Sequence, residues 1–237
     1  MAAVVVDGVP ARALAVYAHP DDAEVACAGT LARWASEGAE VHLVVCTLGD
    51  KGSADPATDP AELAERRAAE SRAAADVLGL ASSVNLGYPD GEVDNDVALR
   101  ARLVAAVRSA RPEAVLSSDP TAVFFGDTYV NHRDHREVGR AVLDTCSPAA
   151  GSPLYFPDAG PPHRVATVYL SGTLEPDAWV DVSDHLDAKV AALRCHRSQL
   201  GEGGDELVAE VVRQRAAEAG RHSGVTYAEG YRRLRLG

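Results

Sequence analysis

Two short clusters of histidine and carboxylate residues have the side chains that hold a catalytic metal ion. The first is His19-Pro20-Asp21-Asp22-Ala23-Glu24, and the second, far along the chain, is Asn131-His132-Arg133-Asp134-His135. Catalytic zinc sites use neutral imidazole and carboxylate ligands, with three protein groups and one position left for water. We expect His19, Asp22 and His135 to supply that set.

The adjacent carboxylates Asp21 and Asp22 can have different roles. Neighbouring side chains diverge in an extended turn, so Asp22 can bind the metal while Asp21 faces a water molecule as general base. Pro20 confines His19 to an extended conformation, which helps to fix this geometry. Metal coordination lowers the pKa of water from near 15.7 to about 7, and a positioned base contributes a further ~10²–10⁴-fold. The cluster therefore predicts metal-assisted hydrolysis.

His132 lies three residues before His135, so both rings can reach one face at the start of a helix. As an imidazolium, His132 could stabilise an oxyanion or pass a proton to a departing amine, and the sequence leaves that choice open. Each cluster alone has a simpler interpretation, since carboxylates also favour helix N-termini and histidines occur on exposed polar turns. Their joint occurrence favours a metal site.

Composition indicates a soluble cytoplasmic protein formed by one domain, residues 1–237. Hydrophobic residues make up 46% of the chain, and the net charge of −12 argues against nucleic acid or anionic membrane as partners. No segment approaches the roughly 18 apolar residues of a membrane helix, and no secretory signal is visible. The four cysteines have no close paired spacing and are expected to be free thiols.

Alternating strands and helices predict an α/β fold with a Rossmann-like, mostly parallel sheet flanked by helices. Strands are expected at 13–18, 41–46, 83–86 and 114–117, and helices at 24–38, 61–78, 97–110 and 132–146. Additional C-terminal elements follow, with edge strands at 165–170 and 179–182 and helices at 185–200, 206–219 and 227–234.

Sheet topology predicts that the two clusters meet. Open parallel sheets bind ligands beyond the carboxyl ends of their strands, where the strand order reverses. In the usual order that point lies between the first strand, which ends at Ala18, and the fourth, which ends near Ser117. The first strand-to-helix turn also lacks Gly-x-Gly-x-x-Gly, which argues against a dinucleotide site.

Several motifs along residues 13–200 resemble the LmbE-like (PIG-L) family of zinc-dependent N-deacetylases. The first and the paired-histidine motifs are specific, and the others are weaker but correctly ordered. The matching segments are Ala18-His19-Pro20-Asp21-Asp22-Ala23-Glu24, Cys27-Ala28-Gly29-Thr30-Leu31, Thr47-x-Gly49, Leu63-Ala64-x-x-Arg67-x-x-Glu70, Leu78-Gly79, Leu86-Gly87-Tyr88-Pro89-Asp90-Gly91, Asn131-His132-x-Asp134-His135 and, less distinctively, His196-Arg197-Ser198-Gln199.

The resemblance implies removal of an acetyl group from an N-acetylglucosamine unit in a small-molecule conjugate. It implies zinc on His19, Asp22 and His135, with Asp21 as base and His132 as electrostatic helper. Arg67 and Asp90 match sugar-contact positions, although Arg67 could instead pair with Glu70, and Asp90 could simply serve its Pro-Asp-Gly turn.

A tyrosine in some family members marks one departure from the pattern. It precedes the first histidine of the pair by two residues, whereas this chain has Val130 there and Tyr129 one residue earlier. We keep Tyr129 as a candidate contact to the tetrahedral intermediate.

Two other functions remain open from the sequence. One is an amidase for a bulkier acyl group, such as a thiol-conjugate amidase, and the other is a catalytically inactive metal-binding protein. A nucleotide-binding module is disfavoured because no loop could cradle phosphate. Zn²⁺ is the expected metal, and a site of two imidazoles and one carboxylate also accepts Fe²⁺, Co²⁺ or Ni²⁺. A homo-oligomer is a further open expectation.

Overall fold

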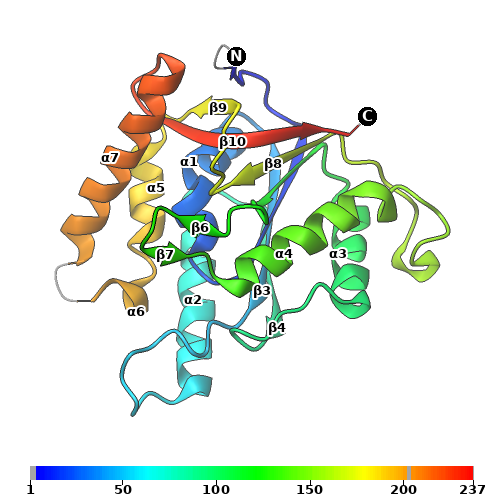
Figure 1. Cartoon of the computed structure of the whole chain (residues 1–237), viewed down its shortest axis with the longest axis horizontal. Coiled ribbons are helices and arrows are strands. Elements are labelled where there is room, and N and C mark those ends of the chain that lie inside the picture. The colour runs from blue at the N-terminus through cyan, green and yellow to red at the C-terminus, as the bar shows by residue number, and fades with distance from the viewer. Residues whose placement is uncertain (1–3, 202–203, 237) are drawn as a thin grey trace.

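An eight-stranded sheet separates two layers of helices in the computed structural model, which describes residues 4–201 and 204–236 (Figure 1). The strand order is β1-β9-β10-β8-β5-β2-β3-β4, and β10 is antiparallel to both of its neighbours. The strands of this sheet are β1 (Val4–Val5), β2 (Arg12–Tyr17), β3 (Glu40–Thr47), β4 (Ser82–Tyr88), β5 (Ala114–Ser118), β8 (Thr167–Ser171), β9 (Ala178–Asp181) and β10 (Ala228–Arg235). This architecture confirms the predicted mostly parallel α/β sheet.

Strand β2 shows why the sheet is covered on both faces. Ala15 and Tyr17 pack into one hydrophobic cluster, whereas Leu14 and Val16 pack into another on the opposite face. A strand buried on both faces has a nearly continuous apolar sequence, as this one does.

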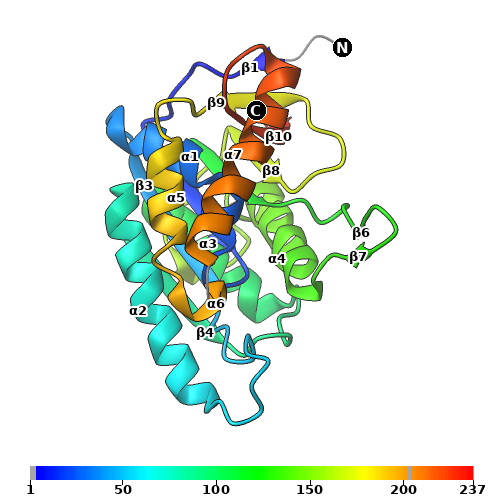
Figure 2. The same cartoon turned by 90° about the vertical axis from the view of Figure 1, so that its left-hand side faces the viewer.

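The helices cover both faces of the sheet, and Figure 2 shows α2, α5 and α7 on the side opposite α4. On one face α1 and α5 contribute to the core together with α7, and α2 packs outside them against α1 and α5. On the other face lie α3 and α4. The helices are α1 (Asp22–Ser36), α2 (Pro60–Leu78), α3 (Val97–Ala110), α4 (Arg133–Asp144), α5 (Leu186–Leu193), α6 (Arg197–Leu200) and α7 (Gly204–Ser223), with a π-helical turn, η1 (Thr145–Ala149), and a 3₁₀ turn, η2 (Pro157–Ala159).

Strands β2 and β5 are parallel neighbours at the point where the strand order reverses. Their carboxyl ends release the two segments that carry the predicted site, and the second segment passes through a hairpin of β6 (Phe124–Phe125) and β7 (Tyr129–Val130) before α4. Gly139 lets α4 approach β5 closely, because a Cβ atom there would lie 2.4 Å from the carbonyl oxygen of Ser118. The expected meeting of the two segments is therefore confirmed.

Three expectations for the C-terminal part were wrong. Residues 228–235 form strand β10 instead of a helix, because pairing with β8 and β9 overrides local helix preference. Strands β8 and β9 were expected at the edge of the sheet, but they are internal, since β10 lies between them and β1 pairs with β9. The helix expected at 185–200 breaks into α5 and α6. Among the described residues, no helix has the length and apolar character needed to cross a membrane.

Candidate metal centre and active site

The turn after β2 carries the first half of the site. His19 is buried with 8% of its surface exposed, and its backbone N–H donates to Asp22 Oδ2 at 2.7 Å. Asp22 is the first residue of α1, and Asp21 precedes it with φ of 102°. That left-handed conformation is strained for a non-glycine residue and directs the two carboxylates along different paths.

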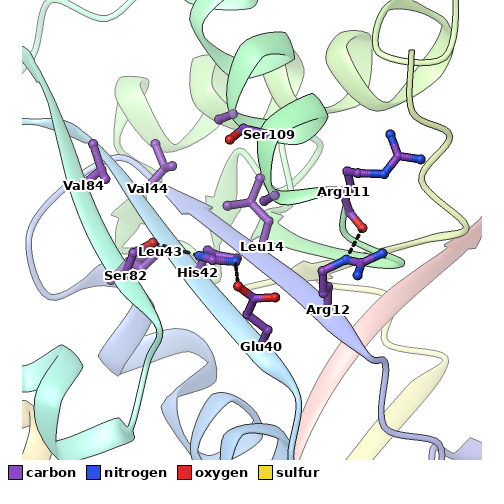
Figure 3. Close-up of a pocket in the computed structure, with 12 residues that line it drawn as sticks. Arg12, Leu14, Glu40, His42, Leu43, Val44, Ser82, Val84, Ser109 and Arg111 are labelled. Atoms are coloured by element: carbon purple, nitrogen blue, oxygen red, sulfur yellow. Dashed lines mark hydrogen bonds and ion pairs between the residues drawn. The ribbon is translucent and has the colours of Figure 1, made fainter. Parts of the chain in front are cut away.

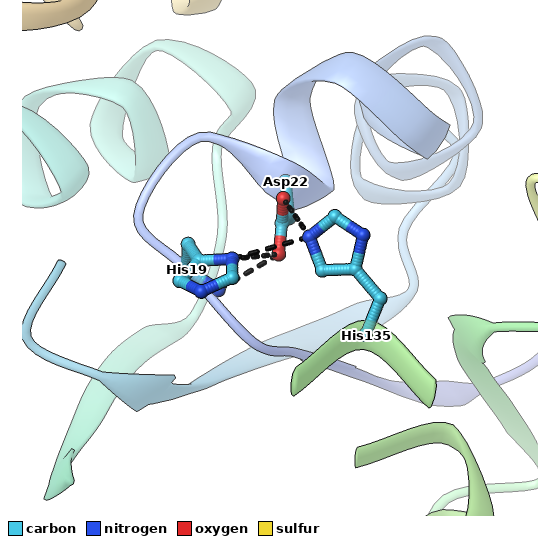
Figure 4. A group of neighbouring side chains, drawn as sticks. All are labelled: His19, Asp22 and His135. Carbon is cyan, nitrogen blue, oxygen red and sulfur yellow. Dashed lines mark hydrogen bonds and ion pairs between the residues drawn. The ribbon is translucent and has the colours of Figure 1, made fainter. Parts of the chain in front are cut away.

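The start of α4 carries the second half. His132 is the N-cap residue, and its Nδ1 accepts a hydrogen bond from the backbone N–H of Asp134 at 3.2 Å. His135, in the first turn of the helix, is half-buried and points to His19 and Asp22, as Figure 4 shows.

Three side chains converge on one point (Figure 4). His19 Nδ1 lies 3.1 Å from His135 Nε2 and 3.3 Å from Asp22 Oδ2, and His135 Nε2 lies 3.1 Å from Asp22 Oδ1. Tetrahedral zinc with ligand distances of about 2.0–2.2 Å separates its ligand atoms by about 3.3–3.6 Å, so small outward movements suffice. The donor set of two imidazoles and one carboxylate fits a divalent metal ion.

In both His19 and His135 the nitrogen that faces away from the cluster contacts a neighbouring side chain, so the nitrogen that faces the cluster is available to a metal. Asn131 Nδ2 donates to the carbonyl oxygen of Ala122 at 2.8 Å, which turns its Oδ1 toward His135 Nδ1 at 3.0 Å. His135 Nδ1 therefore carries the proton, and Nε2 presents its lone pair. His19 Nε2 lies 3.0 Å from Asp90 Oδ1, which favours the proton on Nε2 and the lone pair on Nδ1.

Charges around the cluster shift the pKa values of its members. Burial lowers the pKa of His19, but the carboxylates of Asp134, Asp22 and Asp90 outweigh burial and raise it to about 12. Burial raises the pKa of Asp22, but His135 and His19 outweigh it and hold that pKa well below its usual range. A cluster this rich in negative charge retains a cation, whether protons or a metal ion.

Asp21 is held next to this cluster by Arg67. Arg67 Nη2 donates to the carbonyl oxygen of Pro20 at 2.6 Å and to Asp21 Oδ2 at 3.3 Å. Burial and the charge of Asp22 raise the pKa of Asp21 to about 7, although Arg67 and His196 oppose that shift.

The predicted substrate contacts differ in their access to solvent. Tyr129 is 52% exposed on the β6–β7 hairpin, and the side chain of Asp90 is 12% exposed between His19 and His132. Arg67 is only 3% exposed, and its partners are backbone carbonyls and Asp21 instead of Glu70. The sugar-contact roles of these residues stay predictions.

Four residues near the site had no assigned role at the sequence level. Asn131 and Asp134 belong to the paired-histidine motif, so the signal existed, but only the folded helix shows which ligand each one contacts. Glu24 and His196 are each 1% exposed and lie 3.5 Å apart between Glu24 Oε2 and His196 Nε2. Both belong to recognised motifs, although their distance in the sequence hid the pairing.

A separate cavity of about 480 Å³ lies at the amino ends of β2, β3 and β4 (Figure 3). His42 is its central polar group, with Nδ1 2.8 Å from Ser82 Oγ and Nε2 3.5 Å from Glu40 Oε1. The predicted site is at the opposite ends of these strands, and none of its residues lines the cavity.

Fold and site together define an α/β protein with a candidate metal centre at the switch point of its sheet. The chain belongs to the PIG-L (GlcNAc-PI de-N-acetylase) family, whose model matches residues 14–146. It is 33% identical to a diacetylchitobiose deacetylase of Thermococcus kodakarensis over 93% of this chain and 82% of that protein.

Solved structures show the same fold with more than one chemistry. The N,N'-diacetylchitobiose deacetylase of Pyrococcus horikoshii matches with a TM-score of 0.86 and 28% identity, covering 95% of this chain and 84% of that one. The 4-carboxy-2-hydroxymuconate hydratase GalB of Pseudomonas putida matches with a TM-score of 0.78 and 26% identity, covering 95% and 97%.

Proposed function

We propose that this chain is a zinc-dependent N-deacetylase that hydrolyses the acetamide of an N-acetylglucosamine-type conjugate, releasing acetate and a free amine. One observation carries the proposal: a three-ligand cluster of His19, Asp22 and His135 stands beside an additional carboxylate, Asp21, and an additional imidazole, His132. Similarity to a diacetylchitobiose deacetylase supports the choice of substrate.

The metal is held by His19 Nδ1, Asp22 and His135 Nε2 in this proposal. When bound, a zinc ion acidifies a water molecule and polarises the acetamide carbonyl. Iron(II) fits the same donors, so zinc is the proposed ion and metal analysis tests it.

Asp21 acts as general base. Its carboxylate takes a proton from the attacking water, whose oxygen then bonds to the carbonyl carbon. Breakage of the C–N bond requires a proton on the departing nitrogen, and protonated Asp21 can return the one it received. Arg67 supports this role because it fixes one Asp21 oxygen and leaves the other free for water.

His132 stabilises the oxyanion in this mechanism. Its Nδ1 accepts from the backbone of Asp134, so a neutral ring carries its proton on Nε2. Burial and the charge of His19 lower the pKa of His132, which supports a neutral hydrogen-bond donor over an imidazolium.

Sugar recognition is assigned to Asp90, with Arg67 as the less accessible candidate, and Tyr129 is assigned to the tetrahedral intermediate. We further propose that residues 1–237 act as one domain in the cytoplasm on a small amino-sugar conjugate. Light scattering tests the expected homo-oligomer.

The test combines metal analysis with acetate release from N-acetylglucosamine and N,N'-diacetylchitobiose. Wild type and Asp21→Asn should each bind about one zinc, and Asp21→Asn should hydrolyse ~10²–10⁴-fold more slowly. Asp184→Asn, an exposed carboxylate, is the matched control and should retain full activity. A wild type that binds no metal would overturn the proposal.

Amides with longer acyl chains and 4-carboxy-2-hydroxymuconate complete the panel. If a long acyl group is released faster than acetate, the chain is an amidase for bulkier acyl groups instead of a deacetylase. Hydration of the muconate alone would assign the chain the chemistry named for GalB. Metal binding without turnover of any of these compounds would leave a binding protein.

A further inference from the structure

The segment His196–Gln199 has no part in the proposed chemistry, yet its side chains are engaged with the elements around the site. His196 is 1% exposed. Ser198 donates from its backbone N–H to Glu70 Oε1 at 2.8 Å and from its hydroxyl to Glu70 Oε2 at 2.6 Å. Gln199 Nε2 donates to the carbonyl oxygen of Gly52 at 3.2 Å. These bonds fix α6 both to α2 and to the turn of residues 49–52.

Arg67 reaches the same turn from α2, one helical turn before Glu70. Its Nη1 donates to the carbonyl oxygen of Gly49 at 3.0 Å, while its Nη2 holds Pro20 and Asp21. The turn therefore lies between α6 on one side and the guanidinium that contacts the base on the other.

Glycine at positions 49 and 52 is required by this packing. A Cβ atom on Gly52 would lie 2.3 Å from Arg67 Nη1 and 3.3 Å from Gln199 Oε1, and one on Gly49 would lie 2.5 Å from Arg67 Nη1. Both side chains run directly against the turn, so a shift of either one changes the position of the other.

Asp21 needs such support because its backbone is strained. A non-glycine residue in such a sparsely populated conformation is strained and persists only when its surroundings hold it. Arg67 supplies direct bonds. In the first turn of α1, Glu24 Oε2 lies 3.5 Å from His196 Nε2, so the segment before α6 also contacts the turn that carries Asp21.

The turn also fixes an outer contact of the metal cluster. Asp50 Oδ1 accepts from the backbone N–H of Asp90 at 2.8 Å, and Lys51 Nζ donates to the Asp90 carbonyl oxygen at 2.6 Å. Asp90 Oδ1 in turn lies 3.0 Å from His19 Nε2. One turn therefore connects α6 to the general base and to a metal ligand.

We propose that α6 is a positioning element for catalysis: Ser198 and Gln199 lock it to α2 and to the turn 49–52, and thereby hold Arg67 against Asp21. Glu70, Ser198 and Gln199 do not touch the reacting atoms and act through the bond from Arg67 to Asp21. This inference rests on the proposed role of Asp21 as base.

The test removes the locks singly and together in the zinc-loaded full chain. Glu70→Ala and Gln199→Ala should each lower kcat by about tenfold, and the double variant by up to about a hundredfold, since small displacements of a catalytic group have effects of that order. KM and zinc content should stay within about twofold of wild type, because the variants keep all three metal ligands and the bonds from Asp50 and Lys51 that hold Asp90. Glu70→Gln should restore kcat, since its amide can accept from one Ser198 group and donate to the other.

Asp181→Ala is the matched control, because Asp181 Oδ1 accepts from both the N–H and the hydroxyl of Ser183 at 3.0 and 2.6 Å. Asp181 is the last residue of β9 and Ser183 follows the strand, and three strands separate β9 from β2. Asp181→Ala should leave kcat unchanged even where it lowers Tm as much as the Glu70 and Gln199 variants do.

Two results overturn the inference. One is an unchanged kcat in the double variant. The other is a loss of kcat in Asp181→Ala that is as large, for the same loss of Tm, as in the Glu70 and Gln199 variants. An inactive wild type would instead remove the proposed function. In that case a crystal structure of the zinc-loaded double variant decides the positioning role, which fails if Asp21 keeps its positive φ and its bond to Arg67.

Discussion

His19 Nδ1 and His135 Nε2 face each other at 3.1 Å although 116 residues separate them in the chain. A proton on one nitrogen lets the pair form a hydrogen bond, and a metal ion between them would bind both lone pairs. The carboxylate of Asp22 beside both rings completes an attractive environment for a divalent metal. The residues that orient the two rings should therefore control metal affinity.

Asn131→Ala should weaken zinc binding by about 10- to 100-fold, the usual cost of losing an outer contact to a metal-binding histidine. Without the Asn131 amide, His135 can place its proton on Nε2 and lose its inward lone pair. Competition with a chromogenic chelator measures the affinity.

Asn95→Ala is the control for that variant, since Asn95 donates to Asp144 at the far end of α4. It should bind zinc as wild type does. Equal affinities for all three proteins would remove Asn131 from the metal site.

The meeting of the three predicted ligands could be foreseen because strand order alone brings the ends of β2 and β5 together. The contacts of Asn131 to His135 Nδ1 and of Asp90 to His19 Nε2 could not be foreseen, because they depend on the rotation of α4 and on the loop that carries Asp90. Strand β10 was missed for a related reason. Its sequence has local helix preference, and only pairing with β8 and β9, formed far earlier in the chain, selects the strand.

Tyr129→Phe should lower kcat by about two- to tenfold, the worth of one hydrogen bond to the tetrahedral intermediate. The side chain is 52% exposed on the hairpin that leads into Asn131 and His132, so its hydroxyl is free to turn toward a bound substrate. Steady-state kinetics on the best acetamide measures the effect.

Tyr155→Phe is a matched control, because Tyr155 is 50% exposed on a different loop. Kinetics that are identical for Tyr129→Phe, Tyr155→Phe and wild type would exclude Tyr129 from the mechanism.

One cysteine per chain should react with a thiol reagent in the native protein at pH 8. Cys27, Cys46 and Cys146 are buried, and burial raises the pKa of Cys146 to about 12, so few thiolates form there. Cys195 is partly exposed, so a reagent can reach it, although burial also raises its pKa.

Cys195→Ser should abolish labelling of the native protein, whereas Cys146→Ser should leave it unchanged. Denaturant should expose the remaining thiols of each variant. Rapid native labelling of more than one thiol would contradict the buried placement of the other three.

Glu229 carries a buried charge network that ties β10 to α1. Its Oε1 lies 2.6 Å from Lys189 Nζ, and its Oε2 accepts from Thr30 Oγ1 at 2.6 Å and from the Tyr231 hydroxyl at 3.0 Å. Burial raises the pKa of Glu229, but Lys189 and Thr30 outweigh burial and lower it below 4.5. A depressed carboxyl pKa stabilises the fold above the unfolded value and loses that contribution as pH falls through the folded value.

Glu229→Gln should therefore destabilise the protein by about 3–5 kcal/mol at pH 7, because it leaves the Lys189 ammonium buried without a counter-charge. The difference from wild type should begin to shrink once the pH falls below about 4.5, where the unfolded carboxyl takes up a proton, and should shrink further as the folded carboxyl is protonated at lower pH. Urea unfolding across pH 3–7 measures both effects.

Glu175→Gln is the control for this variant. It breaks the exposed pair with Arg232 and should lower the free energy of unfolding by no more than about 1 kcal/mol. Adding Lys189→Met to Glu229→Gln should recover part of the loss, since the unpaired charge is then gone. A pH-independent difference would show that packing of Glu229, instead of its charge, stabilises this junction.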